Sequence, residues 1–301
     1  MPAPSALTSL LTGDQLDRLR RLELFSRERV VGNRTGDNRS PLRGFSSDFL
    51  QHRQYFAGDS LRYLDWRVLA KADKLVVKQF EELTNAPLYL VLDGSGSMRY
   101  TGHSFSKLEY AVRCAAILTY VMYLQQDTFG LWIFGEGIAN RLPTGGSRRH
   151  LGRVFEALVA VEGRGETDYQ TCFRQVEMQA TRKGIVVVLS DFMAPPEALA
   201  KLMGRLRLRG HDVLALQIVE PTERALEYVD FTRFRDLEDG AVLGADPQTI
   251  GAEYTRQFDL HGRLLKEACL ARGIDLLPLT VSDDYETALG SYLRHRMELL
   301  L

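Results

Sequence analysis

Three side chains that carry oxygen, Asp93, Ser95 and Ser97, alternate with glycines directly after the apolar run 88–92. In an extended loop alternate side chains point the same way, so these oxygens can converge on one ion. A carboxylate and hydroxyls, without Cys or His, suit Mg²⁺, Mn²⁺ or Ca²⁺ rather than zinc. The plain alternative is a Gly/Ser turn in which Asp93 caps the following helix.

Two distant segments add to this loop. A second apolar run, 185–189, ends in Asp191 after one serine, and a glycine-rich loop carries Thr167. Short continuous apolar runs are typical of buried parallel strands, whose carboxyl ends meet at one edge of the sheet, so we expect both carboxylates there. Asp168 competes with Thr167, since Asp is the better N-cap for the next helix. We assign Thr167 as the ligand and Asp168 as the cap.

The three segments together resemble the metal-ion-dependent adhesion site (MIDAS) of von Willebrand factor type A (vWA) domains, which is Asp-x-Ser-x-Ser, then Thr, then Asp. The resemblance implies that Asp93, Ser95, Ser97 and Thr167 are metal ligands, and that Asp191 contributes directly or through water. It also implies that one coordination position is left for a carboxylate of a partner protein. We expect Mg²⁺ as the ion, with Mn²⁺ or Ca²⁺ as alternatives.

A second string, residues 53–66, interleaves opposite charges with aromatic side chains. We expect its arginines to pair with Asp59 or Asp65. Tyr55 and Trp66 would pack beneath these pairs. We favour a structural latch that holds this N-terminal arm to the main sheet over a catalytic role, and a second binding surface stays open as an alternative.

This string and the segment after it resemble the signature of the bacterial domain-of-unknown-function 58 (DUF58) family: Arg-x-Tyr-x-x-Gly-Asp, then Arg-x-x-Asp-Trp, then Val-Lys-x-Phe. The matching positions are Arg53, Tyr55, Gly58, Asp59, Arg62, Asp65, Trp66, Val77, Lys78 and Phe80. The resemblance runs from about residue 25 to beyond Asp191. It implies a partnership with MoxR-type AAA+ ATPases in the assembly, remodelling or metallation of other proteins.

Alternating strand and helix patterns predict an α/β fold with a doubly wound, mostly parallel sheet flanked by helices, of the vWA or Rossmann-like kind. We expect residues 1–84 to form an N-terminal helix and arm packed on a vWA-like domain of residues 85–301, with a β-hairpin insertion at about 222–247. The expected strands are 88–92, 131–134, 185–189, 213–219 and 274–279. The expected helices are 14–30 capped by Asp14, one that begins with a capping box at Ser106, 147–160 capped by Ser147, 168–182, 195–210, 249–272 and one from about 284.

The composition is that of an ordinary globular protein, with 301 residues, 45% hydrophobic and 26% charged. A net charge of -1 gives no overall field that favours nucleic acid or an acidic membrane surface. The three cysteines, Cys114, Cys172 and Cys269, lie far apart in apolar helical patterns, which predicts buried, reduced thiols. Such thiols fit a reducing cytoplasm, where we expect this protein. No window reaches the ~18 apolar residues of a membrane span, so we expect none.

Motifs for common catalytic sites are missing. The loop at Asp93 is not Gly-x-Ser-x-Gly, Ser95 stands where an aspartyl phosphatase needs a second Asp, and no Walker-type loop occurs. We therefore predict a non-catalytic adaptor that binds a partner protein through a metal-bridged carboxylate. The alternatives are a metal-dependent hydrolase that uses Asp93 and Asp191, and a structural subunit with a vestigial metal loop.

Overall fold

The computed structural model describes residues 4–22, 24, 48–55, 65–72, 74–81, 86–102, 105–225 and 230–298. Internal contacts divide the chain into two units, residues 1–28 with 86–301 and residues 29–85. Helices α1 (Pro4–Leu10) and α2 (Gly13–Leu19) thus belong to the larger unit. The sequence pattern instead predicts that they belong with the arm in residues 1–84.

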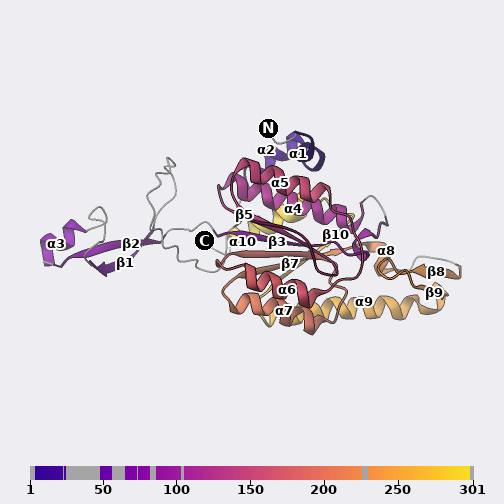
Figure 1. Ribbon diagram of the computed structural model, residues 1–301. Helices are drawn as coiled ribbons and strands as arrows, with labels where there is room; N and C mark the ends of the chain where they lie inside the picture. The colour runs from indigo at the N-terminus through magenta and orange to yellow at the C-terminus, as the bar shows by residue number, and fades with distance from the viewer. Residues whose placement is uncertain are drawn as a thin grey trace. The chain divides into compact units, whose positions relative to one another are not determined.

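The larger unit contains a six-stranded sheet of order β10-β7-β6-β3-β4-β5, in which only the β4–β5 pair is antiparallel (Figure 1). The strands are β3 (Leu88–Asp93), β4 (Phe129–Phe134), β5 (Ile138–Gly145), β6 (Ile185–Ser190), β7 (Asp212–Val219) and β10 (Asp275–Thr280). This confirms the predicted doubly wound, mostly parallel α/β fold.

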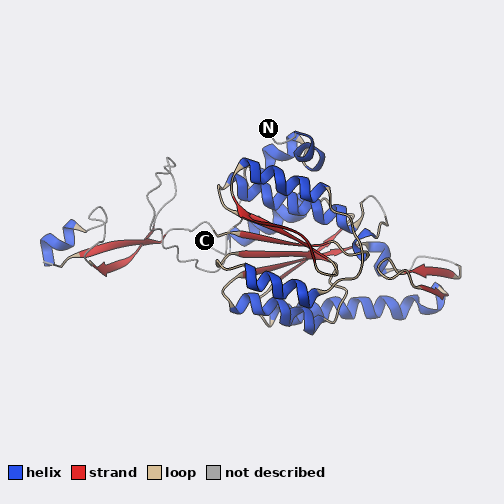
Figure 2. Ribbon diagram, in the orientation of Figure 1, coloured by secondary structure: helices blue, strands red, loops and turns tan. Residues whose placement is uncertain are grey.

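Helices cover both faces of this sheet (Figure 2). One face carries α1, α2, α4 (Lys107–Leu124), α5 (Arg148–Val159) and α10 (Tyr285–Glu298); the other carries α6 (Tyr169–Gln179), α7 (Pro196–Leu208) and α9 (Pro247–Leu270). Every residue of β3, β4 and β6 is buried, as expected for central strands that are covered on both faces. Each fully buried Leu, Val or Ile contributes about 1.5–3 kcal/mol.

The strand order changes direction between β3 and β6. From β3 the chain passes through α4 to β4 on one side, whereas β6, β7 and β10 follow on the other side. Ligands of open α/β sheets bind at the carboxyl ends of strands at such a switch point. Leu92 pairs with Leu189, so that the next residues, Asp93 and Ser190, leave the sheet side by side.

Several helix ends agree with the prediction. Ser106 and Glu109 form the capping box of α4, Ser147 caps α5 and Asp168 caps α6. The expected helix 14–30 is wrong in its start and in its extent, because Thr12, in a capping box with Gln15, caps α2, and the helix stops at Leu19. Residues 25–30 lie outside the described part of the chain.

Strand β5 was not predicted. It is an edge strand in which only Leu142 is buried, and it contains Pro143, so it lacks the apolar pattern of the central strands. The expected hairpin insertion is present as β8 (Thr232–Arg235) and β9 (Val242–Ala245), after a short helix α8 (Pro221–Arg224).

The smaller unit pairs β1 (Asp48–Gln54) with β2 (Val76–Glu81) in antiparallel fashion and carries α3 (Trp66–Ala72). Asp65 Oδ1 accepts a hydrogen bond from Arg67 N over 2.9 Å and so caps α3. Trp66, which we expected to be packed, is 60% exposed.

Other parts of the family signature lie outside the described residues, namely Gly58, Asp59, Arg62 and the side chains of Arg53, Val77, Lys78 and Phe80. The backbone register places Arg53 opposite Val77 and Lys78 opposite His52. The proposed charge pairs and the latch therefore stay predictions.

Cys114, Cys172 and Cys269 are free and buried, as predicted. Across the described ranges, no helix combines the length and the apolar character needed to cross a membrane.

Candidate metal centre

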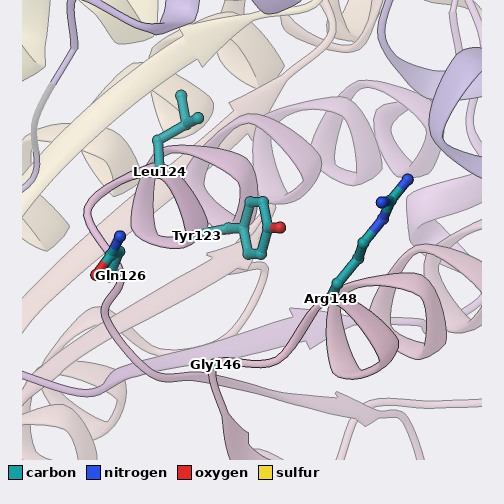
Figure 3. Close-up of a pocket in the computed structure, with 5 residues that line it drawn as sticks. All are labelled: Tyr123, Leu124, Gln126, Gly146 and Arg148. Atoms are coloured by element: carbon teal, nitrogen blue, oxygen red, sulfur yellow. The ribbon is translucent and has the colours of Figure 1, made fainter. Parts of the chain in front are cut away.

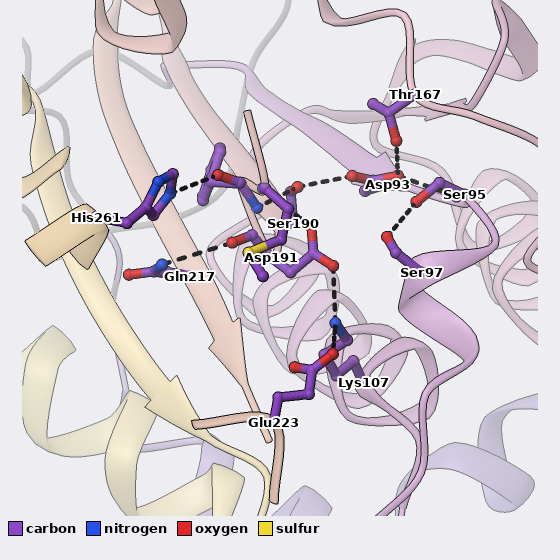
Figure 4. A network of polar contacts seen from close by, with 12 residues as sticks. Asp93, Ser95, Ser97, Lys107, Thr167, Ser190, Asp191, Gln217, Glu223 and His261 are labelled. Carbon is purple, nitrogen blue, oxygen red and sulfur yellow. Dashed lines mark hydrogen bonds and ion pairs between the residues drawn. The ribbon is translucent and has the colours of Figure 1, made fainter. Parts of the chain in front are cut away.

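Asp93 ends β3 with its side chain fully buried among neutral hydrogen-bond donors (Figure 4). Its Oδ2 accepts from Ser190 Oγ at 2.6 Å and Tyr169 Oη at 3.3 Å, and its Oδ1 accepts from Ser95 N at 3.0 Å. Among the residues that the structure describes, no basic side chain forms an ion pair with Asp93. Burial raises the pKa of Asp93 to about 7, and the charge of Asp191 acts in the same direction.

Three hydroxyl groups lie beside this carboxylate. Ser95 Oγ and Ser97 Oγ are 3.0 Å apart, and Thr167 Oγ1 is 3.5 Å from Asp93 Oδ1 (Figure 4). Asp168 instead accepts from Thr171 N at 2.9 Å and caps α6. The structure thus brings four of the predicted site residues together and gives Asp168 the capping role.

Backbone hydrogen bonds hold the loops of the site in place. Gly94 N donates to Phe134 O over 2.7 Å, and Gly96 N donates to Gly165 O over 2.9 Å. The second bond ties the loop of Asp93 to the loop that carries Thr167. Gly165 has φ +67°, in the left-handed region that favours glycine.

Asp191, the fifth predicted residue, lies at the same sheet edge but has a cation of its own (Figure 4). Lys107 Nζ lies 2.8 Å from Asp191 Oδ2 and 2.6 Å from Glu223 Oε1. Lys107 is 1% exposed. Burial alone would lower the pKa of Lys107, but Asp191 and Glu223 outweigh burial and raise it, so the ammonium group stays charged.

Phe192, directly after Asp191, has a left-handed backbone conformation. Phe192, buried and with φ +54°, donates from its N–H to Ser190 Oγ at 2.9 Å, and its carbonyl oxygen lies 3.0 Å from His261 Nε2. Such a conformation costs on the order of 1–3 kcal/mol in a residue other than glycine and is concentrated at functional sites. The turn holds Asp191 at the end of β6.

Four residues of the site are not predicted from the sequence: Ser190, Tyr169, Lys107 and Glu223. The position of Lys107 could have been noticed in the sequence, because it is the first residue of an apolar helix. The dipole at the N-terminus of a helix disfavours a cation. Such a position indicates nearby carboxylates. Glu223 carried no such signal, since it meets Lys107 only through the fold, 116 positions away in the sequence.

The residues around Asp93 fit a hard divalent cation. A buried carboxylate and three hydroxyls offer only oxygen, the donor that Mg²⁺ and Ca²⁺ prefer. Within the described ranges no group of three or more His, Cys, Asp or Glu side chains is arranged for a metal ion. A cation here would therefore depend on the serine and threonine hydroxyls as well as on Asp93.

A pocket lies at the other end of the strands from Asp93, where α4 ends and α5 begins. It is lined by Tyr123, Leu124, Gln126, Gly146 and Arg148 (Figure 3). Arg148 is the one charged residue in this lining, and no carboxylate accompanies it. The pocket thus lacks the oxygen donors that gather at Asp93.

The chain is similar to several known proteins. Two relatives, uncharacterized protein Mb1516 of Mycobacterium bovis and uncharacterized protein Rv1480 of Mycobacterium tuberculosis, are each 26% identical over 298 residues, covering 94% of this chain and 92% of the relative. The fold is similar to that of BatB from Bacteroides thetaiotaomicron, with a TM-score of 0.46, 17% identity and coverage of 71% of this chain and 99% of that one. It is also similar to the SpRpn10 VWA domain, with a TM-score of 0.42, 11% identity and coverage of 71% and 95%.

The family assignment comes from the sequence itself. The profile of the family described as "Protein of unknown function DUF58" matches residues 51–263, which is more than half of the chain. The match takes in the whole signature string, both apolar strands and the candidate metal centre. The chain therefore belongs to the DUF58 family.

Proposed function

We propose that this chain is a non-catalytic adaptor that binds a divalent cation at the ends of β3 and β6 and presents it to a carboxylate of a partner protein. One observation carries the proposal: Asp191 has an internal cation in Lys107, whereas Asp93 faces three hydroxyls and has no basic partner among the described residues. A buried carboxylate without a nearby positive charge is costly. An external cation would supply that charge.

In this proposal Asp93, Ser95, Ser97 and Thr167 hold the ion, and Asp191 contributes directly or through water. Mg²⁺ is the proposed ion, because it binds through one or two carboxylates and keeps other positions for further ligands. When bound, it would supply a positive charge that attracts a partner's carboxylate. The protein's own part is to hold these oxygen donors together at the carboxyl ends of β3 and β6.

Family membership and the resemblance of the signature string support a MoxR-type AAA+ ATPase as the partner. The adaptor would then serve in protein assembly, remodelling or metal insertion. The buried, free cysteines support a reducing compartment, and we propose the cytoplasm.

The rival function, a metal-dependent hydrolase, has less support from the geometry. A general base must reach the proton that it abstracts. Asp93 is 0% and Asp191 is 4% exposed, and Asp191 is already bound to Lys107. A carboxylate buried among hydroxyls and a second one held by Lys107 are both poorly placed to take a proton from a substrate.

The test compares Asp93→Asn with Asp168→Asn, which makes the same charge change one residue from Thr167 and keeps a residue able to cap α6. Calorimetric titration with Mg²⁺ measures binding of the ion. A pull-down from native cytoplasm, with Mg²⁺ or with chelator, measures retention of an AAA+ ATPase.

We expect wild type and Asp168→Asn to bind Mg²⁺ and to retain the ATPase only with Mg²⁺, whereas Asp93→Asn loses both. Equal retention with chelator would mean that the ATPase docks elsewhere. Absence of Mg²⁺ binding by wild type would refute the metal site.

A further inference from the structure

The hairpin insertion lies directly on the candidate metal loop. A Cβ atom at Gly96 would lie 2.2 Å from Leu237 O and 3.1 Å from Glu238 Cα. Real Cβ atoms do not approach a carbonyl oxygen this closely, so Gly96 has room only for its hydrogens. The turn between β8 and β9 therefore packs with its backbone against the loop that carries Ser95 and Ser97.

The turn itself uses two of its three acidic side chains. Asp236 Oδ1 accepts from Glu238 N at 2.7 Å, and Asp239 Oδ1 accepts from Ala241 N at 2.7 Å. Gly240 completes the turn with φ +77°. Asp236 and Asp239 are exposed, whereas Glu238 is partly buried. The turn is thus braced without Glu238, whose side chain is available for another role.

The Glu238 carboxylate faces Ser97. Burial raises the pKa of Glu238, hydrogen bonding from the Ser97 hydroxyl and backbone N–H lowers it, and the charge of Asp191 raises it. The geometry agrees, because Glu238 Cα lies 3.1 Å from where a Cβ atom of Gly96 would be, between Ser95 and Ser97, and its side chain is partly buried. It comes from a segment outside the three that the MIDAS pattern describes.

The rest of the hairpin is weakly held. Phe231, Val242 and Leu243 are 68%, 61% and 68% exposed. Segments with few buried apolar contacts open at low free-energy cost. The contact between the turn and the metal loop should therefore decide whether the hairpin is docked.

We propose that Glu238 is an internal ligand of the metal site, so that its carboxylate takes the coordination position that a partner's carboxylate would otherwise take. This inference rests on the proposed function. It makes the hairpin a competitor of the partner, which must displace Glu238 to reach the ion. The competition would be intramolecular and present at every protein concentration.

Glu238→Gln is the main variant, because glutamine keeps the size of the side chain and an oxygen that can accept from Ser97. Glu166→Gln is the matched control, because Glu166 is exposed and adjoins Thr167, so it removes the same charge near the site. Mn²⁺ replaces Mg²⁺ as the probe. Calorimetry gives its Kd, water-proton relaxation counts the waters on the ion, and acetate serves as a small carboxylate that can replace a water.

We expect Glu238→Gln to weaken Mn²⁺ binding about tenfold. We also expect one additional water on Mn²⁺ in this variant, which acetate displaces. In wild type and Glu166→Gln acetate should displace no water, and their Kd values should agree within about twofold, because an exposed charge is screened.

Two results separate the inference from the proposed function. If wild type binds Mn²⁺, Asp93→Asn does not, and Glu238→Gln matches wild type in Kd and water count, the internal ligand is refuted and the metal site stands. If wild type binds no Mn²⁺, both are refuted.

Hydrogen exchange gives a second measurement that does not depend on affinity. Mn²⁺ should slow amide exchange in residues 232–245 of wild type and of Glu166→Gln, but not of Glu238→Gln. Equal slowing in Glu238→Gln would overturn the inference, because the hairpin would then dock on the loop without its carboxylate.

Discussion

Two carboxylates at the ends of neighbouring strands, Asp93 on β3 and Asp191 after β6, have different partners. Both are buried, at 0% and 4% exposure. Asp191 lies 2.8 Å from the ammonium group of Lys107, whereas Asp93 has only neutral donors among the described residues. The difference suggests that the chain carries a permanent cation for one carboxylate and leaves the other for a cation from solution.

Substitutions at Asp93 and at the Lys107 pair should therefore have different effects on stability and on Mg²⁺ binding. Loss of the internal cation should destabilise the fold, because two carboxylates would lose the charge they share. Loss of the Asp93 carboxylate should leave the fold in place and remove the response to Mg²⁺. The predictions below test this contrast in order of expected size.

Replacement of the internal cation, Lys107→Met, should have the largest effect. It leaves Asp191 and Glu223 buried without their partner, and breaking a buried pair in this way costs about 3–5 kcal/mol. Urea unfolding of wild type and variant measures the difference. Lys201→Met, on the exposed side of α7, is the control and should change stability by less than about 0.5 kcal/mol. A similarly small loss in Lys107→Met would remove the basis of the comparison.

Asp93→Asn should abolish the stabilisation of the fold by Mg²⁺. At a Mg²⁺ concentration one hundred times its Kd, wild type should gain about 2.7 kcal/mol in its free energy of unfolding. Without Mg²⁺, the variant should unfold close to wild type, because asparagine keeps the buried hydrogen-bond acceptor. Melting temperatures with and without Mg²⁺ test this. A full Mg²⁺ response in Asp93→Asn would place the ion elsewhere.

Asp127, next to the pocket at the other end of the strands, is a third buried carboxylate, and burial raises its pKa to about 7. The native state then keeps its proton between pH 4 and 7 while the unfolded state loses it, so stability falls as pH rises through this window. Asp127→Asn removes that loss and should stabilise the protein by about 1–2 kcal/mol at pH 8, with no gain near pH 4. Urea titrations at both pH values measure it.

An equal effect of Asp127→Asn at both pH values would show that Asp127 does not titrate in this window. Mg²⁺ should leave the difference in unfolding free energy between Asp127→Asn and wild type unchanged. The described lining of the nearby pocket contains no cluster of hydroxyls that could hold the ion.

Thr167→Val should have the smallest effect. It removes one hydroxyl beside Asp93 and keeps the shape of the side chain, so metal-free stability should change little. Mg²⁺ should bind about tenfold more weakly, which is about 1.4 kcal/mol less stabilisation at saturating ion. Asp168→Asn should leave the Mg²⁺ affinity unchanged. A loss of Mg²⁺ affinity in Asp168→Asn but not in Thr167→Val would show that Asp168 is the ligand and Thr167 is not.

The sequence predicted the sheet and the convergence of the loops well, because both follow from local patterns. The runs before Asp93 and Asp191 are apolar throughout, and parallel strands bring their carboxyl ends to one edge. Edge strand β5 has no such pattern, with Leu142 as its one buried residue, and was missed.

The tertiary contacts of the site were beyond such reasoning. Lys107 meets Asp191 across 84 positions and Glu223 across 116, and the hairpin turn meets Gly96 from an equally distant part of the sequence. No periodicity or spacing in the sequence indicates that residues so far apart will be in contact. Of the signature residues of the arm, Asp65 caps α3, whereas Gly58, Asp59 and Arg62 lie outside the described residues.

The most direct test of the central claim is a crystal structure of the wild-type protein grown with Mn²⁺, with an anomalous difference map to locate the ion. We predict a single strong peak among Asp93, Ser95, Ser97 and Thr167, with Lys107 still bound to Asp191. No peak at Asp93, or a peak between Asp191 and Glu223 with Lys107 displaced, would contradict the account.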